Sequence, residues 1–201
     1  IAASVARYDA GDPITVAGPQ LKVMTAPDFA GYAWPARAML LAPWLREGSL
    51  TMLHAPRGIG KSWRALTIAM AVSGGYDARA FGWSIEAPAE SIYLDAEMAP
   101  DDMAFRLRAL CDVNVMPDKL RILSAMAADG PLPSLAQPEG RLLVEDCIGP
   151  AKLIVLDNVS TLWTGLGDHN AAESWDVAQE WLLSLRRKGM AVLVVDHGGK
   201  S

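Results

Sequence analysis

The stretch "HAPRGIGKS", residues 54–62, decides the fold of this chain. Its closing Gly-Lys-Ser matches the pattern G-x-x-x-x-G-K-[ST], except that Ala55 stands where the pattern has its first glycine. Ala55 ends an apolar run, where a methyl group is tolerated if φ stays negative. Gly58 and Gly60 leave the turn itself free to approach a ligand closely. The departure at Ala55 is therefore mild, and the stretch predicts a phosphate-binding loop.

The loop also has the neighbours that such a site needs, an apolar run over 49–55 and a helix from Lys61. Backbone N–H groups and the start of that helix hold the phosphates of a nucleotide. Lys61 would reach the β- and γ-phosphates, and the hydroxyl of Ser62 would bind Mg²⁺. The predicted nucleotide-binding residues are Ala55, Pro56, Arg57, Gly58, Ile59, Gly60, Lys61, Ser62 and Trp63.

Short apolar runs alternate with amphipathic helices along the rest of the chain. The runs cover 49–55, 91–96, 119–125, 152–157 and 190–196, and helices are predicted over 61–73, 100–111 and 171–188. Runs that are apolar at consecutive positions are typical of strands buried on both faces of a parallel sheet. The pattern therefore predicts an α/β fold, a mostly parallel twisted sheet between layers of helices.

Two domains are predicted. Residues 1–40 form an N-terminal arm or linker, rich in Gly, Pro and Ala over 1–35, with a short strand near "LKVM" (21–24). Residues 41–201 form the core. The sequence stops just after an apolar run, so we expect this core to be incomplete at its carboxyl end.

Composition excludes several classes of function. The 201 residues carry a formal net charge of −5, which argues against a bulk basic surface that coats nucleic acid. No apolar run approaches the ~18 residues of a membrane span, so no membrane partner is expected. The two cysteines, Cys111 and Cys147, are far apart and lack metal-binding spacing, which suits a reducing cytoplasm.

Three carboxylates follow apolar runs. Asp157 ends the run 153–156 and is the expected partner for Mg²⁺, although an aspartate after a strand is also a common turn residue. Asp95 and Glu97 are two positions apart, so strand periodicity places both on one face, towards the phosphates. A glutamate there can polarise an attacking water, and the alternative is a solvated pair before a helix. We select Glu97 as the catalytic carboxylate.

The glutamate at this position resembles that of RecA-like P-loop ATPases, and the segment from "LDNVSTLW" to "VVDHGGK" resembles RepA-like hexameric replicative helicases of plasmids and phages. The likeness covers residues ~45–201. It implies ATP with Mg²⁺, catalytic roles for Glu97 and Lys61, and contact between His197 and the γ-phosphate. Asp196 stands where that family has the first histidine of a pair. A plain turn residue is the alternative interpretation of His197.

The resemblance implies an ATP-driven motor domain of a DNA helicase that acts on single-stranded DNA as a homo-oligomer, a six-membered ring, in replication. The stretch "WTGLGDHN" corresponds to the first pore-facing loop, in which Trp163 is the candidate for base stacking. An arginine finger is expected from a neighbouring subunit, together with Lys200. Two alternatives stay open, a P-loop kinase, although 98–150 lacks an arginine-rich lid, and a non-catalytic nucleotide switch, which would leave Glu97 without a role.

Overall fold

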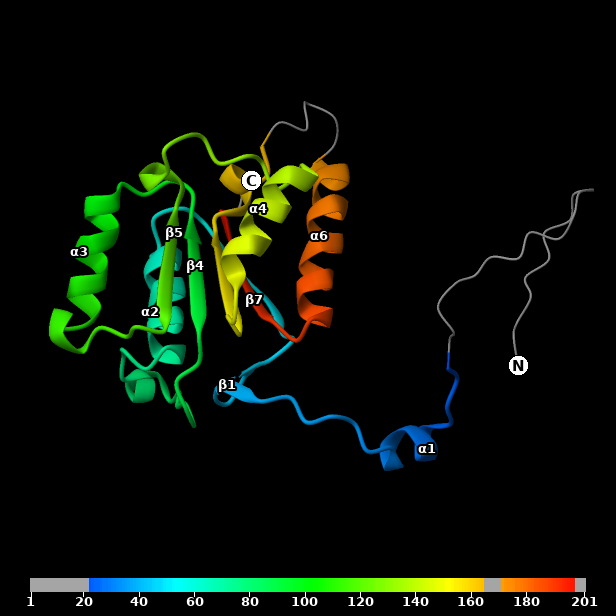
Figure 1. Cartoon of the computed structure of the whole chain (residues 1–201). Coiled ribbons are helices and arrows are strands. Elements are labelled where there is room, and N and C mark those ends of the chain that lie inside the picture. Colours follow the sequence, from blue (N-terminus) through cyan, green and yellow to red (C-terminus); the bar gives the residue numbers. More distant parts are fainter. Residues whose placement is uncertain (1–21, 165–170, 198–201) are drawn as a thin grey trace, which may run out of the picture. The chain divides into compact units, whose positions relative to one another are not determined.

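The computed structural model describes residues 22–164 and 171–197 (Figure 1). Packing divides the chain into two units, residues 1–36 and 37–201. In the first unit, helix α1 (Ala26–Gly31) begins after Thr25, whose hydroxyl accepts a hydrogen bond from the backbone N–H of Asp28. Residues 22–24 are not in a strand, so the strand expected near "LKVM" is absent from its described part. The boundary after residue 40 stays a prediction.

The second unit is built on five parallel strands in the order β3-β7-β6-β4-β5 (Figure 1). The strands are β3 (Leu50–Ala55), β4 (Ser91–Asp95), β5 (Leu120–Ser124), β6 (Leu153–Asp157) and β7 (Ala191–His197). Each coincides with one of the apolar runs, which confirms the predicted α/β fold. Strands β4 and β6 are buried at every position, whereas the edge strand β3 alternates between exposed and half-buried residues. Consecutive apolar residues thus mark the centre of the sheet better than its edges.

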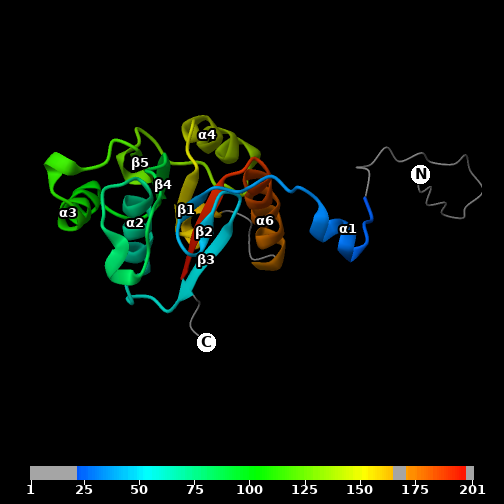
Figure 2. The ribbon, with the colours of Figure 1, turned by 90° about the horizontal axis from the view of Figure 1, so that it is seen from below.

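Helices cover both faces of this sheet (Figure 1 and Figure 2). Helices α2 (Lys61–Val72) and α3 (Pro100–Leu110) cover one face, and α4 (Pro138–Ile148) and α6 (Ala171–Arg187) cover the other. The strands divide their side chains between two hydrophobic cores, so that Tyr93 and Val155 pack with α2 whereas Leu94 and Ile154 pack with α4 and α6. The remaining elements are β1 (Met39–Leu41), β2 (Leu45–Arg46), α5 (Val159–Leu162) and the 3-10 turns η1 (Ala78–Phe81), η2 (Val113–Val115) and η3 (Ala125–Ala127).

Helix α4 was not predicted from the sequence. Its first turn carries the usual signals, Pro138 at the start and Glu139 beside it. However, Leu142 and Leu143 are 63% and 47% exposed, so its apolar residues do not form a single buried stripe.

The strand register brings the polar ends of the strands to one edge of the sheet. Asp95 is level with Asp157 on β6, and Ala55 is level with His197 on β7. Since parallel strands present their carboxyl ends to the same edge, the phosphate loop and the three carboxylates share that edge.

Candidate phosphate-binding site

The loop between β3 and α2 has the backbone that a phosphate-binding turn needs. Gly58 and Gly60 have φ of 85° and 88°, in the left-handed region that side chains other than glycine rarely adopt. No atom lies within 4 Å of a Cβ built at either position, so conformation rather than space requires glycine. Ala55 is the last residue of β3, where the backbone is extended and φ is negative.

Lys61 points back into the loop. Its side chain is buried, and its Nζ donates to the carbonyl oxygens of Ala55 at 2.5 Å and Pro56 at 2.7 Å. The ammonium therefore lies inside the turn, at the start of α2, where the helix dipole also favours anions.

Tyr93 on β4 connects two of the predicted site residues. Its hydroxyl donates to Asp157 Oδ2 at 2.5 Å and lies 3.3 Å from the carbonyl oxygen of Ser62. Burial, with the charge of Asp157 next, raises the pKa of Tyr93 well above its ordinary value, so the phenol stays protonated and acts as a donor. The sequence analysis missed Tyr93, although it is two positions before Asp95 and thus shares its face of the strand.

Asp95 and Glu97 lie in different surroundings. Asp95 is 2% exposed, and its Oδ2 accepts the backbone N–H of Met98 at 2.9 Å. Burial, with a contribution from the charge of Asp157, raises the pKa of Asp95 to about 6. The strand ends at Asp95, and Ala96 packs towards the core on the α4 and α6 side, as strand periodicity predicts.

Glu97 is exposed, and its carboxylate accepts a hydrogen bond from the Thr161 hydroxyl in α5. The backbone N–H of Thr161 donates to the Asn158 side chain at 3.2 Å, and Asn158 follows Asp157 directly. The segment after β6 therefore orients Glu97, and Glu97 rather than Asp95 is the carboxylate open to solvent.

The carboxyl end of β7 lies beside β3. Asp196 Oδ2 contacts His54 Nδ1 across the two strands at 2.7 Å. His197 is level with Ala55 in the register, although its side chain lies outside the described residues, as do residues 198–201 with Lys200. The β7 strand thus reaches the phosphate loop directly.

Arg106 on α3 is a cation that the sequence analysis did not select. Its guanidinium carbon lies 5.1 Å from the centre of the Trp63 ring, and its charge acts to lower the pKa of both Asp95 and Tyr93. Trp63 directly follows Ser62, so Arg106 places a positive charge beside the loop from within the same chain. Helix periodicity alone cannot reveal this contact, because α3 packs on α2 only in the folded chain.

A family model described as an AAA domain matches residues 19–201. The chain belongs to this AAA-domain family. The match agrees with the parallel α/β sheet and the phosphate loop, which together are the RecA-like P-loop NTPase fold. No curated protein is significantly similar to the chain in sequence.

The donor set of the AAA domain suits Mg²⁺. The Ser62 hydroxyl and the Asp157 carboxylate are hard oxygen donors, and the Tyr93 hydroxyl contacts both residues. Within the described ranges, no group of three or more His, Cys, Asp or Glu could hold a metal ion. Proteins bind Mg²⁺ through one or two carboxylates plus the substrate phosphates rather than in a full protein cage.

The expectation for Trp163 is wrong. Its side chain is buried in the AAA domain, and its ring centre lies 5.9 Å from that of Trp181 on α6. A tryptophan in the core is not available to stack on DNA bases. The rest of the predicted DNA loop, residues 165–170, lies outside the described residues.

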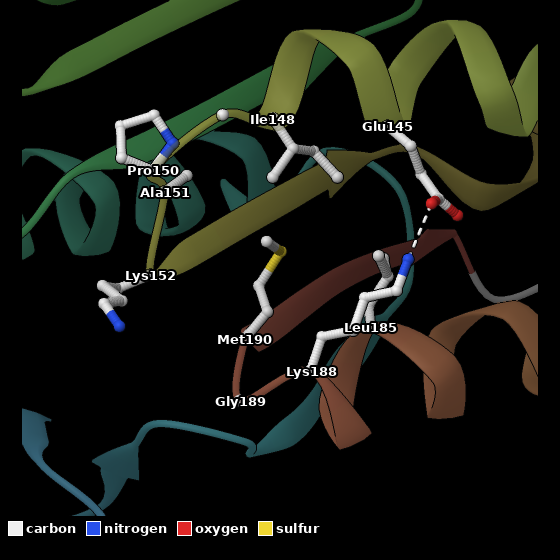
Figure 3. Close-up of a pocket in the computed structure, with 10 residues that line it drawn as sticks. Glu145, Ile148, Pro150, Ala151, Lys152, Leu185, Lys188, Gly189 and Met190 are labelled. Atoms are coloured by element: carbon white, nitrogen blue, oxygen red, sulfur yellow. Dashed lines mark hydrogen bonds and ion pairs between the residues drawn. The ribbon is translucent and has the colours of Figure 1, made fainter.

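A cavity of about 340 Å³ lies at the edge of the sheet opposite the phosphate loop (Figure 3). It is lined by the carboxyl ends of α4 and α6 and by Lys152 and Met190, just before β6 and β7. Lys188 crosses its wall to Glu145 at 2.7 Å. The cavity is thus remote from the phosphate loop.

None of the helices in the described part of the chain is long and apolar enough to cross a membrane.

Proposed function

We propose that this AAA domain hydrolyses ATP as the motor domain of a RepA-like DNA helicase that acts on single-stranded DNA. The observation that carries the hydrolytic part is the position of Glu97. Its carboxylate lies beyond the carboxyl end of β4, is exposed, and is oriented by Thr161 from the segment that follows Asp157. A nucleotide switch without hydrolysis would not need a glutamate held at this place.

The phosphates would bind to the loop backbone and to Lys61. We expect the Lys61 ammonium to exchange its bonds to the Ala55 and Pro56 carbonyls for bonds to phosphate oxygens. Ser62 and Asp157 would hold Mg²⁺, which when bound neutralises charge on the phosphates. Tyr93 would hold the Asp157 carboxylate in one orientation as a donor that stays protonated.

Glu97 would orient the attacking water and accept its proton. A general base must lie within hydrogen-bond reach of the proton that it removes, and the Thr161 hydroxyl restricts the rotamers open to Glu97. Arg106 would contribute positive charge close to the loop through its contact with Trp63.

The helicase part of the proposal rests on the resemblance of the β6 and β7 segments to RepA-like proteins. It includes single-stranded DNA as a partner, a hexameric ring, a role in replication and contact of His197 with the γ-phosphate. The proposal also includes a cytoplasmic location, which two free cysteines, Cys111 and Cys147, would suit.

ATP turnover should be measured with and without single-stranded DNA, for the wild type and for Glu97→Gln. We expect stimulation by DNA, and a fall in turnover of about 10²–10⁴-fold for Glu97→Gln with ATP binding retained. Thr161→Val should cause a smaller fall in turnover, because the Thr161 hydroxyl only orients Glu97. Binding without any turnover in the wild type would support the nucleotide switch, and phosphate transfer to a small acceptor would support the kinase.

A further inference from the structure

A second cavity, of about 430 Å³, lies at the amino-terminal edge of the sheet, between the turn before β3 and the turn before β7. Gly48 and Gly189 of these turns line it together with three arginines, Arg37, Arg186 and Arg187. The backbone N–H of Gly48 donates to the carbonyl oxygen of Gly189 at 2.9 Å, which joins the two turns. Gly189 also lines the cavity shown in Figure 3. A volume of this order is typical of pockets that take small ligands.

The backbone of the first turn orients two of the arginines. Arg37 Nε donates to the carbonyl oxygen of Glu47 at 2.6 Å, and Arg186 Nε donates to that of Gly48 at 2.9 Å. Arg37 Nη2 also donates to the Ser49 hydroxyl at 3.2 Å. Within the described residues, Arg37 Nη1 and both Nη atoms of Arg186 make no hydrogen bond. A guanidinium group that is oriented through Nε and keeps free Nη groups suits an anion with several oxygens, such as phosphate.

Gly48 leaves the space between these two side chains open. A Cβ built at this position would lie 3.3 Å from the carbonyl oxygen of Arg186 and 3.7 Å from Arg37 Nε. A larger side chain would therefore crowd both arginines. The glycine is also required by the turn itself, since its φ is 63°.

The helix dipole is the alternative explanation for Arg186 and Arg187, because cations are favourable at the carboxyl end of a helix. However, the carbonyl oxygens of residues 184–186 already accept the backbone N–H groups of residues 188–190. Arg186 bonds to the turn before β3 instead, and Arg187 makes no hydrogen bond to any described residue. The backbone thus caps α6, and the two arginines keep donors for another partner.

The charge of the three arginines is not neutralised locally. No carboxylate within residues 22–164 and 171–197 forms an ion pair with any of them. Glu47 also lines the cavity, but its carboxylate pairs with Lys152 at 3.1 Å. Like charges that share one cavity repel each other, and a bound anion would reduce this repulsion. The chain as a whole has a net charge of −5, so this cationic cavity is a local exception to its composition.

We propose that this cavity binds a small phosphate compound with two or more negative charges. Three arginines around one space match such a compact anion better than a nucleic acid strand, whose charges are spread along its length. Sites for single-stranded nucleic acid also carry aromatic side chains on which bases stack, and none of the described residues that line the cavity is aromatic. The inference goes beyond ATP hydrolysis, because the cavity and the phosphate loop lie at opposite edges of the sheet.

Calorimetric titration with inorganic pyrophosphate in EDTA tests this inference. We expect two sites in the wild type, one at the phosphate loop and one in the cavity. Lys61→Ala should remove the loop site alone. Arg187→Ala should weaken binding at the cavity site about tenfold, with an unchanged melting temperature in the absence of ligand, because Arg187 makes no hydrogen bond within the described residues. Arg186→Ala should weaken it at least as much.

The matched control is Arg79→Ala, which removes an arginine that pairs with Asp77 at 2.6 Å outside this cavity. It should keep both sites. A wild type with one site, which Lys61→Ala removes and the Arg186 and Arg187 variants keep, would overturn the inference and leave the proposed function intact. One site that only the Arg186 and Arg187 variants weaken would support the inference and count against the proposed function.

Fluorescence anisotropy with a single-stranded oligothymidylate distinguishes the two sources of phosphate. We expect Arg187→Ala to bind the oligonucleotide as the wild type does. If Arg187→Ala instead weakened oligonucleotide binding and left both pyrophosphate sites unchanged, the cavity would belong to a nucleic acid surface, and the inference would be overturned.

Discussion

At the scale of single residues, the carboxylates of the site differ because each has a different partner. Asp157 accepts the Tyr93 hydroxyl, Asp95 accepts a backbone N–H, and Glu97 accepts the Thr161 hydroxyl. The sequence could place all three acids at strand ends, because strand periodicity is local. It could not assign these partners, since Tyr93 and Asp157 are 64 positions apart and meet only when β4 pairs with β6.

The Tyr93 hydroxyl should contribute measurably to stability. Tyr93→Phe leaves Asp157 buried without this donor, so we expect a loss of about 1–3 kcal/mol in the free energy of unfolding. Urea denaturation measures this loss, and Tyr76→Phe serves as the control. In the Asp157→Asn background, Tyr93→Phe should lower the free energy of unfolding by less than it does in the wild type. Strictly additive losses would show that the two side chains do not interact.

Asp95 should make the fold less stable as the pH rises. Its pKa is about 6 in the folded chain, against 3.8 when it is unperturbed, so between these values the folded state holds a proton that the unfolded state releases. The penalty is absent below about pH 4 and complete above about pH 6. Asp95→Asn can still accept the Met98 N–H. It should therefore melt higher than the wild type at neutral pH, and the gap should close as the pH falls.

Melting temperatures of the wild type and Asp95→Asn, measured in EDTA at about pH 4 and about pH 8, compare the two proteins without bound metal. A gap that stays constant over this range would mean that Asp95 is ionised with its ordinary pKa despite its burial.

At the scale of elements, the sequence predicted the central strands well and α4 not at all. Strands β4 and β6 are buried on both faces, so their apolar runs are continuous and easy to recognise. Helix α4 buries only part of its surface, and a segment rich in proline and glycine precedes it. Its place against the sheet depends on tertiary contacts that no local pattern encodes.

Gly140 shows how closely α4 is fitted to the preceding segment. A Cβ at this position would lie 2.4 Å from the carbonyl oxygen of Ser134 and 2.7 Å from that of Pro133. Both are backbone atoms, so the helix or the segment must move. We expect Gly140→Ala to cost about 1–3 kcal/mol in the free energy of unfolding, as overpacking does. Gly130→Ala, where no atom lies within 4 Å, is the control and should change little.

At the scale of the whole molecule, the sheet places every candidate group at one edge. The phosphate loop follows β3, Glu97 follows β4, and Asp157 ends β6, although β7 separates β3 from β6 and β4 in the sheet. The predicted parallel sheet implied this arrangement, and the parallel register produces it. Arg106 could not be chosen in advance, because its contact with Trp63 exists only once α2 and α3 have packed.

The last prediction concerns how the site is completed between subunits. Phosphoryl transfer gains about 10³–10⁵-fold from an arginine beside the γ-phosphate. Arg106 is stacked on Trp63 and Arg64 on Phe81, so we expect a neighbouring subunit to supply this cation. Head-to-tail interfaces close into rings where the rotation between subunits closes, and the ring is the arrangement that we expect here. Turnover per subunit should then rise steeply with protein concentration, in step with the mass measured by light scattering. Arg106→Ala should lower turnover without changing this dependence. A monomer that keeps full specific activity on dilution with ATP and single-stranded DNA would exclude a shared site and assign the cation to the same chain.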